Sequence, residues 1–183
     1  MYDWMNNMKK LYLTDDHIKS ACCSIMSQMY RDNFKPKYIV GITRGGLVPA
    51  LYLSHMTGIP MHTLDIRLRD ANHDPESNGW MPQDAFGVFQ QGYGFEGDNI
   101  LIVDDINDTG ETFEWLIQDW QNNCLPTDER WEEVWGESVR FATVIENMSS
   151  KFGFVNYHEY EVNKAEDDLW VVFPWEEPLK QTL

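Results

Sequence analysis

The chain of 183 residues contains no run of about 18 apolar residues and only three cysteines. Without such a run, no membrane span is expected. The first ten residues lack the apolar core of a signal peptide. Cys22, Cys23 and Cys124 form no metal-binding spacing, and their odd number argues against a disulfide framework. These absences predict a protein of the reduced cytoplasm.

Basic residues are also scarce. The chain has 14 Lys and Arg against 30 Asp and Glu, a formal net charge of −16. This charge argues against nucleic acid and against an anionic membrane as partners. No Lys or Arg occurs between Arg69 and Arg130, a gap that holds 14 of the 30 acidic residues. An anionic substrate would therefore need a divalent cation to offset the repulsion.

Strand-like and helix-like segments alternate along a chain whose length fits one domain, residues 1–183. Helices are expected near 14–33, 47–56 and 111–122, and strands at 38–42, 61–68, 100–103, 139–145 and 169–173. The segment 152–162 is ambiguous and fits either a helix or a strand. This alternation predicts an α/β fold with a doubly wound, mainly parallel sheet, whose site lies at the C-terminal ends of the strands.

Two stretches interrupt the pattern. Residues 70–98 are rich in Asn, Asp, Gly and Gln without an apolar period, which is typical of a functional lid or a small hairpin. Residues 125–136 form an acidic insertion that contains tryptophan.

The most informative segment begins with four apolar residues, 100–103, which predict a buried central strand. The strand delivers Asp104 and Asp105 to its C-terminal edge, and Asp108 follows. Thr109-Gly110-Glu111-Thr112 then opens a helical pattern. A strand, an acidic edge and a turn of amides and hydroxyls form a place for a phosphate, a sugar and a divalent metal.

Residues 103–112 resemble the ribose-phosphate signature of the type I phosphoribosyltransferases. Residues 39–50 are similar to the pyrophosphate loop of that family, and 168–176 to its base-binding segment. Asp108 resembles the 6-oxopurine branch, and the likeness is greatest to the xanthine-guanine enzymes. The resemblance implies a core at about 14–147, a lid at 70–98 and a base-binding C-terminal hood at about 148–183.

The family transfers a 5-phosphoribosyl group from phosphoribosyl diphosphate to a base, releasing diphosphate, and uses Mg²⁺. The resemblance implies that Asp104 and Asp105 hold the ribose hydroxyls, directly or through the metal. Asp108 would contact N7 of a purine and exchange its proton, so Asp108, Asp105 and Asp104 are the catalytic candidates. The 5-phosphate would bind the loop made by Asp108, Thr109, Gly110, Glu111 and Thr112.

Further roles follow from the same resemblance. The diphosphate would bind the turn of Thr43, Arg44, Gly45 and Gly46, with Arg67 and Arg69 as nearby cations. The base would contact Trp170 and Val171, and Glu176 would lie near metal or base. The default substrate is guanine, xanthine or hypoxanthine, and a homo-oligomer is expected.

At one position the chain departs from the family. The 6-oxopurine enzymes place a Lys after the fourth core strand to bind the 6-oxo group, and Asn147 stands there in this chain. An amide both donates and accepts hydrogen bonds, so a 6-amino group would also fit. Lys151 is close enough in sequence to substitute.

Other interpretations of the acidic segment remain open. Asp104-Asp105-x-x-Asp108 also occurs in the all-helical prenyl-diphosphate synthases, although a strand-like run precedes it here. A haloacid-type phosphatase would need Asp-x-Asp, and a plain acidic loop would need no ligand. On the phosphoribosyltransferase fold itself, a non-catalytic nucleotide sensor or an assembly protein with a relict site are the alternatives to an enzyme.

Overall fold

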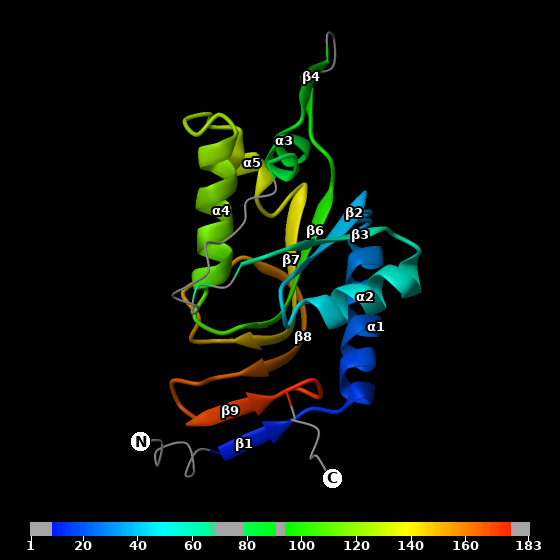
Figure 1. Ribbon diagram of the computed structural model, residues 1–183, viewed down its shortest axis with the longest axis vertical. Helices are drawn as coiled ribbons and strands as arrows, with labels where there is room; N and C mark the ends of the chain where they lie inside the picture. Colours follow the sequence, from blue (N-terminus) through cyan, green and yellow to red (C-terminus); the bar gives the residue numbers. More distant parts are fainter. Residues whose placement is uncertain (1–8, 67, 69–78, 91–93, 177–183) are drawn as a thin grey trace, which may run out of the picture.

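A computed structural model describes residues 9–66, 68, 79–90 and 94–176 (Figure 1). Its centre is a five-stranded sheet of order β3-β2-β6-β7-β8, and every neighbouring pair is parallel. The strands are β2 Tyr38–Ile42, β3 Met61–Leu64, β6 Ile100–Asn107, β7 Val139–Asn147 and β8 Val155–Val162. This sheet confirms the α/β fold expected from the sequence.

Helices cover both faces of the sheet (Figure 1). One face packs against α1 Asp15–Arg31 and α2 Leu47–Thr57. The other face packs against α4 Glu111–Asn123, α3 Met81–Phe86 and α5 Trp131–Val134. The two apolar cores on opposite faces make the sheet doubly wound, as predicted. None of the helices in the described ranges is long and apolar enough to cross a membrane.

Helix α1 shows how closely local sequence determined the structure. Thr14 and His17 form a capping box, in which each side chain accepts a hydrogen bond from the other residue's backbone N–H. The residues that recur at helical spacing are the buried ones: Ile18, Ala21, Cys22, Ile25 and Met29. The helix ends at Arg31, within two residues of the predicted end at 33.

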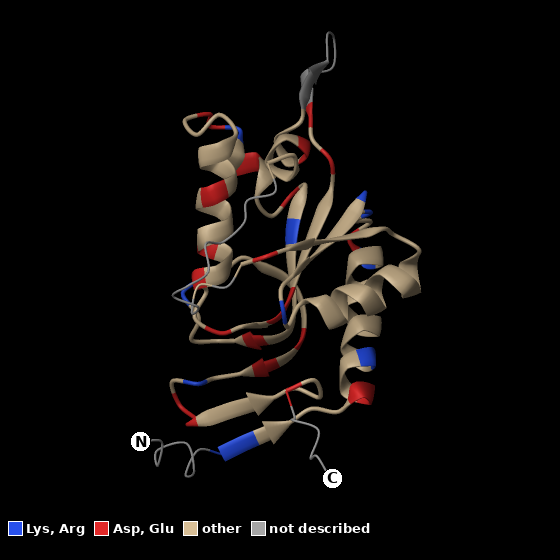
Figure 2. Ribbon diagram, in the orientation of Figure 1, with Lys and Arg blue, Asp and Glu red and all other residues tan. Residues whose placement is uncertain are grey.

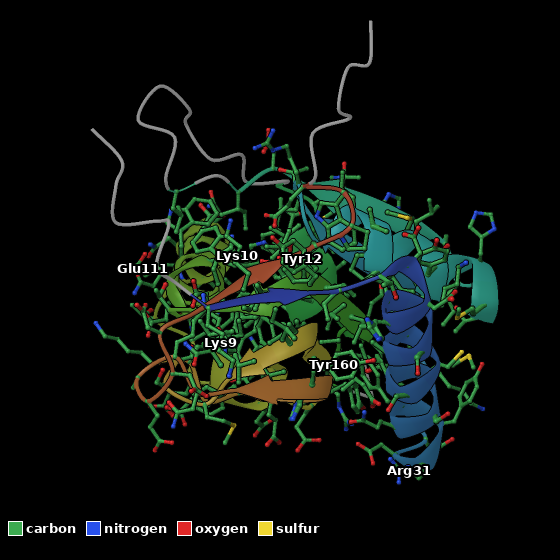
Figure 3. The ribbon with its side chains drawn as sticks, turned by 90° about the horizontal axis from the view of Figure 1, so that it is seen from below. Lys9, Lys10, Tyr12, Arg31, Glu111 and Tyr160 are labelled. Atoms are coloured by element: carbon green, nitrogen blue, oxygen red, sulfur yellow. The ribbon has the colours of Figure 1, made fainter. Side chains whose placement is uncertain are left out.

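A second, two-stranded sheet lies below the central one. In it β1 Lys9–Tyr12 pairs in parallel with β9 Leu169–Val172 (Figures 1 and 3). All four side chains of β1 are exposed, so the strand has no polar-apolar alternation and was not predicted. This pair of strands joins the N-terminal region to the C-terminal hood.

Several boundaries differ from those expected. Strand β6 extends through Asp104 and Asp105 to Asn107, so both acids are part of the strand. Segment 152–162 contributes β8 to the central sheet, which therefore continues past residue 147. Strand β3 ends at Leu64 rather than Leu68.

The region expected to be a lid or hairpin contains a short antiparallel hairpin, β4 Val88–Gln90 with β5 Gly94–Glu96. Helix α3 precedes it and was not predicted, although Met81, Ala85 and Phe86 are buried. Residues 69–78, with Arg69, and Arg67 lie outside the described residues. In the insertion at 125–136, Trp131 is buried in the core.

Candidate active site

A cavity of about 1100 Å³ lies at the C-terminal ends of β2 and β6. Residues 43–45, from the turn after β2, line it, and so do residues 104–113, from β6 and the start of α4. Acidic residues follow one another along the connection from β6 to α4 (Figure 2). The two loops that the sequence assigned to one phosphorylated substrate therefore face the same cavity.

The turn after β2 packs directly against the acidic end of β6. A Cβ atom added to Gly45 would lie 1.9 Å from Oδ2 of Asp105, and one added to Gly46 would lie 2.3 Å from the carbonyl oxygen of Val103. Only glycine permits this approach. The peptide bond between Thr43 and Arg44 is cis, and the Thr43 hydroxyl donates a hydrogen bond to Asp65.

The paired carboxylates of Asp104 and Asp105 are partly buried at the cavity wall. The backbone N–H of Asp105 donates to Oδ1 of Asp104 at 2.9 Å. Burial raises the pKa of Asp104 well above its ordinary value, and the neighbouring charge of Asp105 raises it further. Burial also raises the pKa of Asp105 to about 6, and the negative charge of Glu176 adds to that rise. Both carboxyl groups therefore bind a proton more tightly than an exposed Asp does.

These carboxylates fit a magnesium ion. Mg²⁺ prefers hard oxygen ligands and is bound through one or two carboxylates together with substrate phosphates, rather than by a full protein cage. Asp104 and Asp105 supply such a pair. Their pKa values are raised, and a bound cation would lower them by favouring the ionised carboxylates. Within the described ranges no group of three or more His, Cys, Asp or Glu side chains forms a metal site.

The loop before α4 has the form of a phosphate cradle. Gly110 is the N-cap of α4 with φ of +92°, and an added Cβ atom would lie 2.7 Å from the backbone N of Phe152. The backbone N–H of Lys151 donates to the carbonyl oxygen of Thr109 at 3.2 Å. The backbone N–H groups in the first turn of a 13-residue helix favour an anion here. Thr109, Glu111 and Thr112 also line the cavity.

A buried amide braces this loop from behind. Asn107 is 2% exposed, and its Nδ2 donates to Oε1 of Glu146 and to the carbonyl oxygen of Phe152, each at 2.9 Å. The hydroxyl of Ser150 donates to Asn107 Oδ1 at 3.0 Å. The β7–β8 connection therefore holds the end of β6 and the loop before α4 in place.

Asn147 has a bracing position and is not a cavity-lining residue. Its Nδ2 donates to the carbonyl oxygen of Asp108 at 2.8 Å. Its Oδ1 accepts from the hydroxyl of Ser149 at 2.9 Å and from the backbone N–H of Lys164 at 3.0 Å. The amide that replaces the family's Lys is thus engaged within the protein.

Lys164 is the residue that sequence reasoning missed. Its Nζ lies 2.9 Å from Oδ1 of Asp108 and 5.6 Å from the ring centroid of Trp170. A signal was present, because Lys164 is the one Lys or Arg between Lys151 and Lys180. The local sequence could not show that the β8–β9 connection brings it to Asp108.

The hood residues divide into two groups. Trp175 and Glu176 line the cavity, and the ring of Trp175 stacks on that of Phe173 at 4.9 Å between centroids. Trp170 is 39% exposed and Val171 is buried, and neither lines the cavity. Trp170 is linked to the cavity through Lys164 and Asp108.

A doubly wound sheet with an acidic cavity at its C-terminal edge is the arrangement of α/β proteins that bind phosphorylated ligands. A family model described as phosphoribosyl transferase domain matches residues 12–182. The xanthine-guanine phosphoribosyltransferase of Cereibacter sphaeroides is 32% identical over 152 residues, 81% of this chain and 74% of the relative. That of Desulfotalea psychrophila is 30% identical over 140 residues, 76% and 70% of the two chains. This chain belongs to the phosphoribosyltransferase family.

Solved structures agree on the fold. The chain is similar to a purine phosphoribosyltransferase from Pyrococcus horikoshii, with a TM-score of 0.63 and 24% identity over 93% of this chain and 96% of the other. A Helicobacter pylori xanthine-guanine-hypoxanthine phosphoribosyltransferase gives 0.60 and 14% over 91% and 93%. The predictions of family, fold type and enzyme class, a pentosyltransferase, are confirmed.

Proposed function

We propose that this enzyme transfers the 5-phosphoribosyl group of phosphoribosyl diphosphate to a 6-oxopurine: guanine, xanthine or hypoxanthine. The observation that carries the proposal is the single cavity lined both by the turn at Thr43–Gly45 and by the loop at Asp108–Thr112. A substrate with a phosphate at one end and a diphosphate at the other spans the two. The names of the relatives in Cereibacter and Desulfotalea support a purine base.

Each part of the sugar phosphate has a matching group. The 5-phosphate binds the amides and hydroxyls of the loop from Thr109 to Thr112 at the start of α4. The ribose hydroxyls donate to Asp104 and Asp105, because ionised carboxylates only accept hydrogen bonds. The guanidinium of Arg44 binds the diphosphate in a forked geometry.

The reaction forms a bond between a ring nitrogen of the base and C1 of the ribose. The bond from C1 to the diphosphate oxygen breaks, and diphosphate leaves with the electron pair. Positive charge develops on the sugar in between, where the carboxylates of Asp104 and Asp105 stabilise it. Asp108 takes the proton from N7, which leaves the base a better nucleophile. Holding both substrates in one cavity lowers the entropic part of the barrier.

Mg²⁺ is part of this proposal, held by Asp104 and Asp105, directly or through water. When bound, the ion neutralises the charge on the diphosphate. A homo-oligomer in the cytoplasm completes the proposal, on the strength of the resemblance alone.

The test is a panel of bases incubated with phosphoribosyl diphosphate and Mg²⁺ while diphosphate release is followed. We expect release with guanine, xanthine or hypoxanthine, and a large fall in turnover, about 100-fold or more, for Asp108→Asn. Binding of phosphoribosyl diphosphate without turnover of any base would instead support the sensor. No binding would support an assembly protein with a relict site.

A further inference from the structure

The ammonium group of Lys164 and the carboxylate of Asp108 form a pair at the edge of the cavity. Lys164 Nζ lies 2.9 Å from Asp108 Oδ1, and the two side chains are 19% and 25% exposed. Asp108 lines the cavity. The pair therefore presents a hydrogen-bond donor and an acceptor side by side, in partial shelter from water.

The pair is held from behind by one buried amide. Asn147 is 4% exposed, and it donates to the carbonyl oxygen of Asp108 while it accepts from the backbone N–H of Lys164. One side chain thus fixes the backbones of both members of the pair, which come from different loops. Because the two loops are already ordered, binding costs little conformational entropy, which favours recognition of a rigid ligand.

The surroundings of Lys164 suit a flat heterocycle. Its Nζ lies 5.6 Å from the centroid of the Trp170 ring. At this distance the π face of the ring attracts the ammonium group. Trp170 is 39% exposed, so its ring is accessible to a second aromatic ring. Among the described residues that line the cavity, Arg44 is the one Lys or Arg, and it lies in the turn proposed for the diphosphate. Lys164 is therefore the cation best placed for the base.

The donor and acceptor order matches one class of purine. A guanine-type ring carries O6 beside N7 on one edge, whereas adenine carries an amino donor in place of that oxygen. A Lys ammonium only donates hydrogen bonds and an ionised Asp only accepts them. Lys164 then pairs with O6, and Asp108 pairs with a protonated N7. Against adenine, two donors would face each other and one would remain unpaired at a cost.

We infer that Lys164 is the specificity-determining residue that selects 6-oxopurines over 6-aminopurines. The inference rests on the proposed function and deepens it. The ammonium group of Lys164 comes from the β8–β9 connection. Asn147 stands where the resemblance places the family's Lys, and it acts here as a positioning residue.

The experiment compares kcat/KM for hypoxanthine and adenine, whose ring substituents differ only at position 6, in wild type, Lys164→Met and Lys164→Gln. We expect Lys164→Met to lower kcat/KM for hypoxanthine by about 10- to 100-fold and to leave that for adenine unchanged or raised. Phosphoribosyl diphosphate binding, measured by calorimetry with Mg²⁺, stays at the wild-type level and shows that the fold and the sugar-phosphate site are intact. If the Met variant does not fold, Lys164→Gln is measured instead. Its amide also accepts a hydrogen bond, so we expect it to lower the ratio of kcat/KM for hypoxanthine to that for adenine in the same direction.

Two other lysines serve as comparisons. Lys35→Met, an exposed change before β2 at the opposite end of the sheet, is the matched control and keeps the wild-type ratio. An unchanged ratio in both Lys164 variants, or a fall in Lys151→Met alone, would overturn the inference while turnover and the proposed function stand. Absence of diphosphate release by the wild type with every base would overturn both.

Discussion

Gly45 lies so close to Asp105 that a Cβ atom on the glycine would meet both oxygens and Cγ of that carboxylate, at 2.7, 1.9 and 2.3 Å. Gly45 lies in the turn after β2 and Asp105 lies in β6, so their contact brings the proposed diphosphate turn against the proposed ribose site. The missing side chain at position 45 is therefore a requirement of the site as well as of the turn.

Gly45→Ala should impair activity more than folding. The new methyl group meets the far end of a flexible side chain, so the carboxylate of Asp105 moves and the backbone stays. We expect kcat/KM to fall by about 10-fold or more, while the free energy of unfolding falls by about 1 kcal/mol. Steady-state kinetics and urea unfolding measure the two effects.

Gly153→Ala is the matched control, because nothing lies within 4 Å of its added Cβ atom. It should leave both quantities close to wild type. Equal kinetics for Gly45→Ala and Gly153→Ala would contradict the close packing of the turn on Asp105.

Asn147→Ala should destabilise the protein and disorder the pair formed by Asp108 and Lys164. The change removes a buried amide and leaves the Asp108 carbonyl and the Lys164 N–H without their partner. A loss of about 1 to 3 kcal/mol in the free energy of unfolding is expected. Asn122→Ala, an exposed change on α4, is the control. A variant at 147 as stable as the control would show that the brace contributes nothing.

The raised pKa of Asp105 predicts how stability depends on pH without ligand. The pKa of this carboxyl is about 6 in the folded protein against an ordinary 3.8, so the folded state binds the proton more tightly than the unfolded state does. The contribution of Asp105 to stability is therefore greatest below pH 4 and is lost as pH rises to about 6. Asp105→Asn should remove this loss and be more stable than wild type by about 1 to 3 kcal/mol at pH 8.

Urea unfolding of both proteins from pH 4 to 8 checks this prediction. The difference should grow up to about pH 6 and then stay constant, while Asp167→Asn, an exposed change, shows no such growth. An Asn variant that is less stable than wild type at pH 8 would contradict the assignment.

The sequence predicted the elements whose signals are local. Helix α1 has a cap and an apolar stripe, strand β2 is buried along its whole length, and β6 opens with four apolar residues, 100–103. Strand β1 could not be predicted, because its four exposed residues gain their strand structure from β9, about 160 residues away. Helix α3 was missed because its six residues are too few to establish a period.

The candidate site divides in the same way. The acids of β6, the turn after β2 and the loop before α4 are continuous motifs, so the sequence alone could propose them as site residues, and all three contribute to the lining of one cavity. Lys164 was missed because its contact with Asp108 spans 56 residues and depends on how the β8–β9 connection folds back. Asn147 was placed correctly at the end of β7, but its partners are backbone groups that no motif reveals.

The most direct test of one shared site is a calorimetric titration of phosphoribosyl diphosphate with Mg²⁺ into three proteins: wild type, Arg44→Met and Thr112→Val. Each variant removes one contact from one of the two loops, and Thr127→Val, an exposed change outside the cavity, is the control. We predict tight binding to wild type and the control, and binding weakened by about 10-fold or more in both variants. Wild-type affinity in either variant would contradict a substrate held between the two loops.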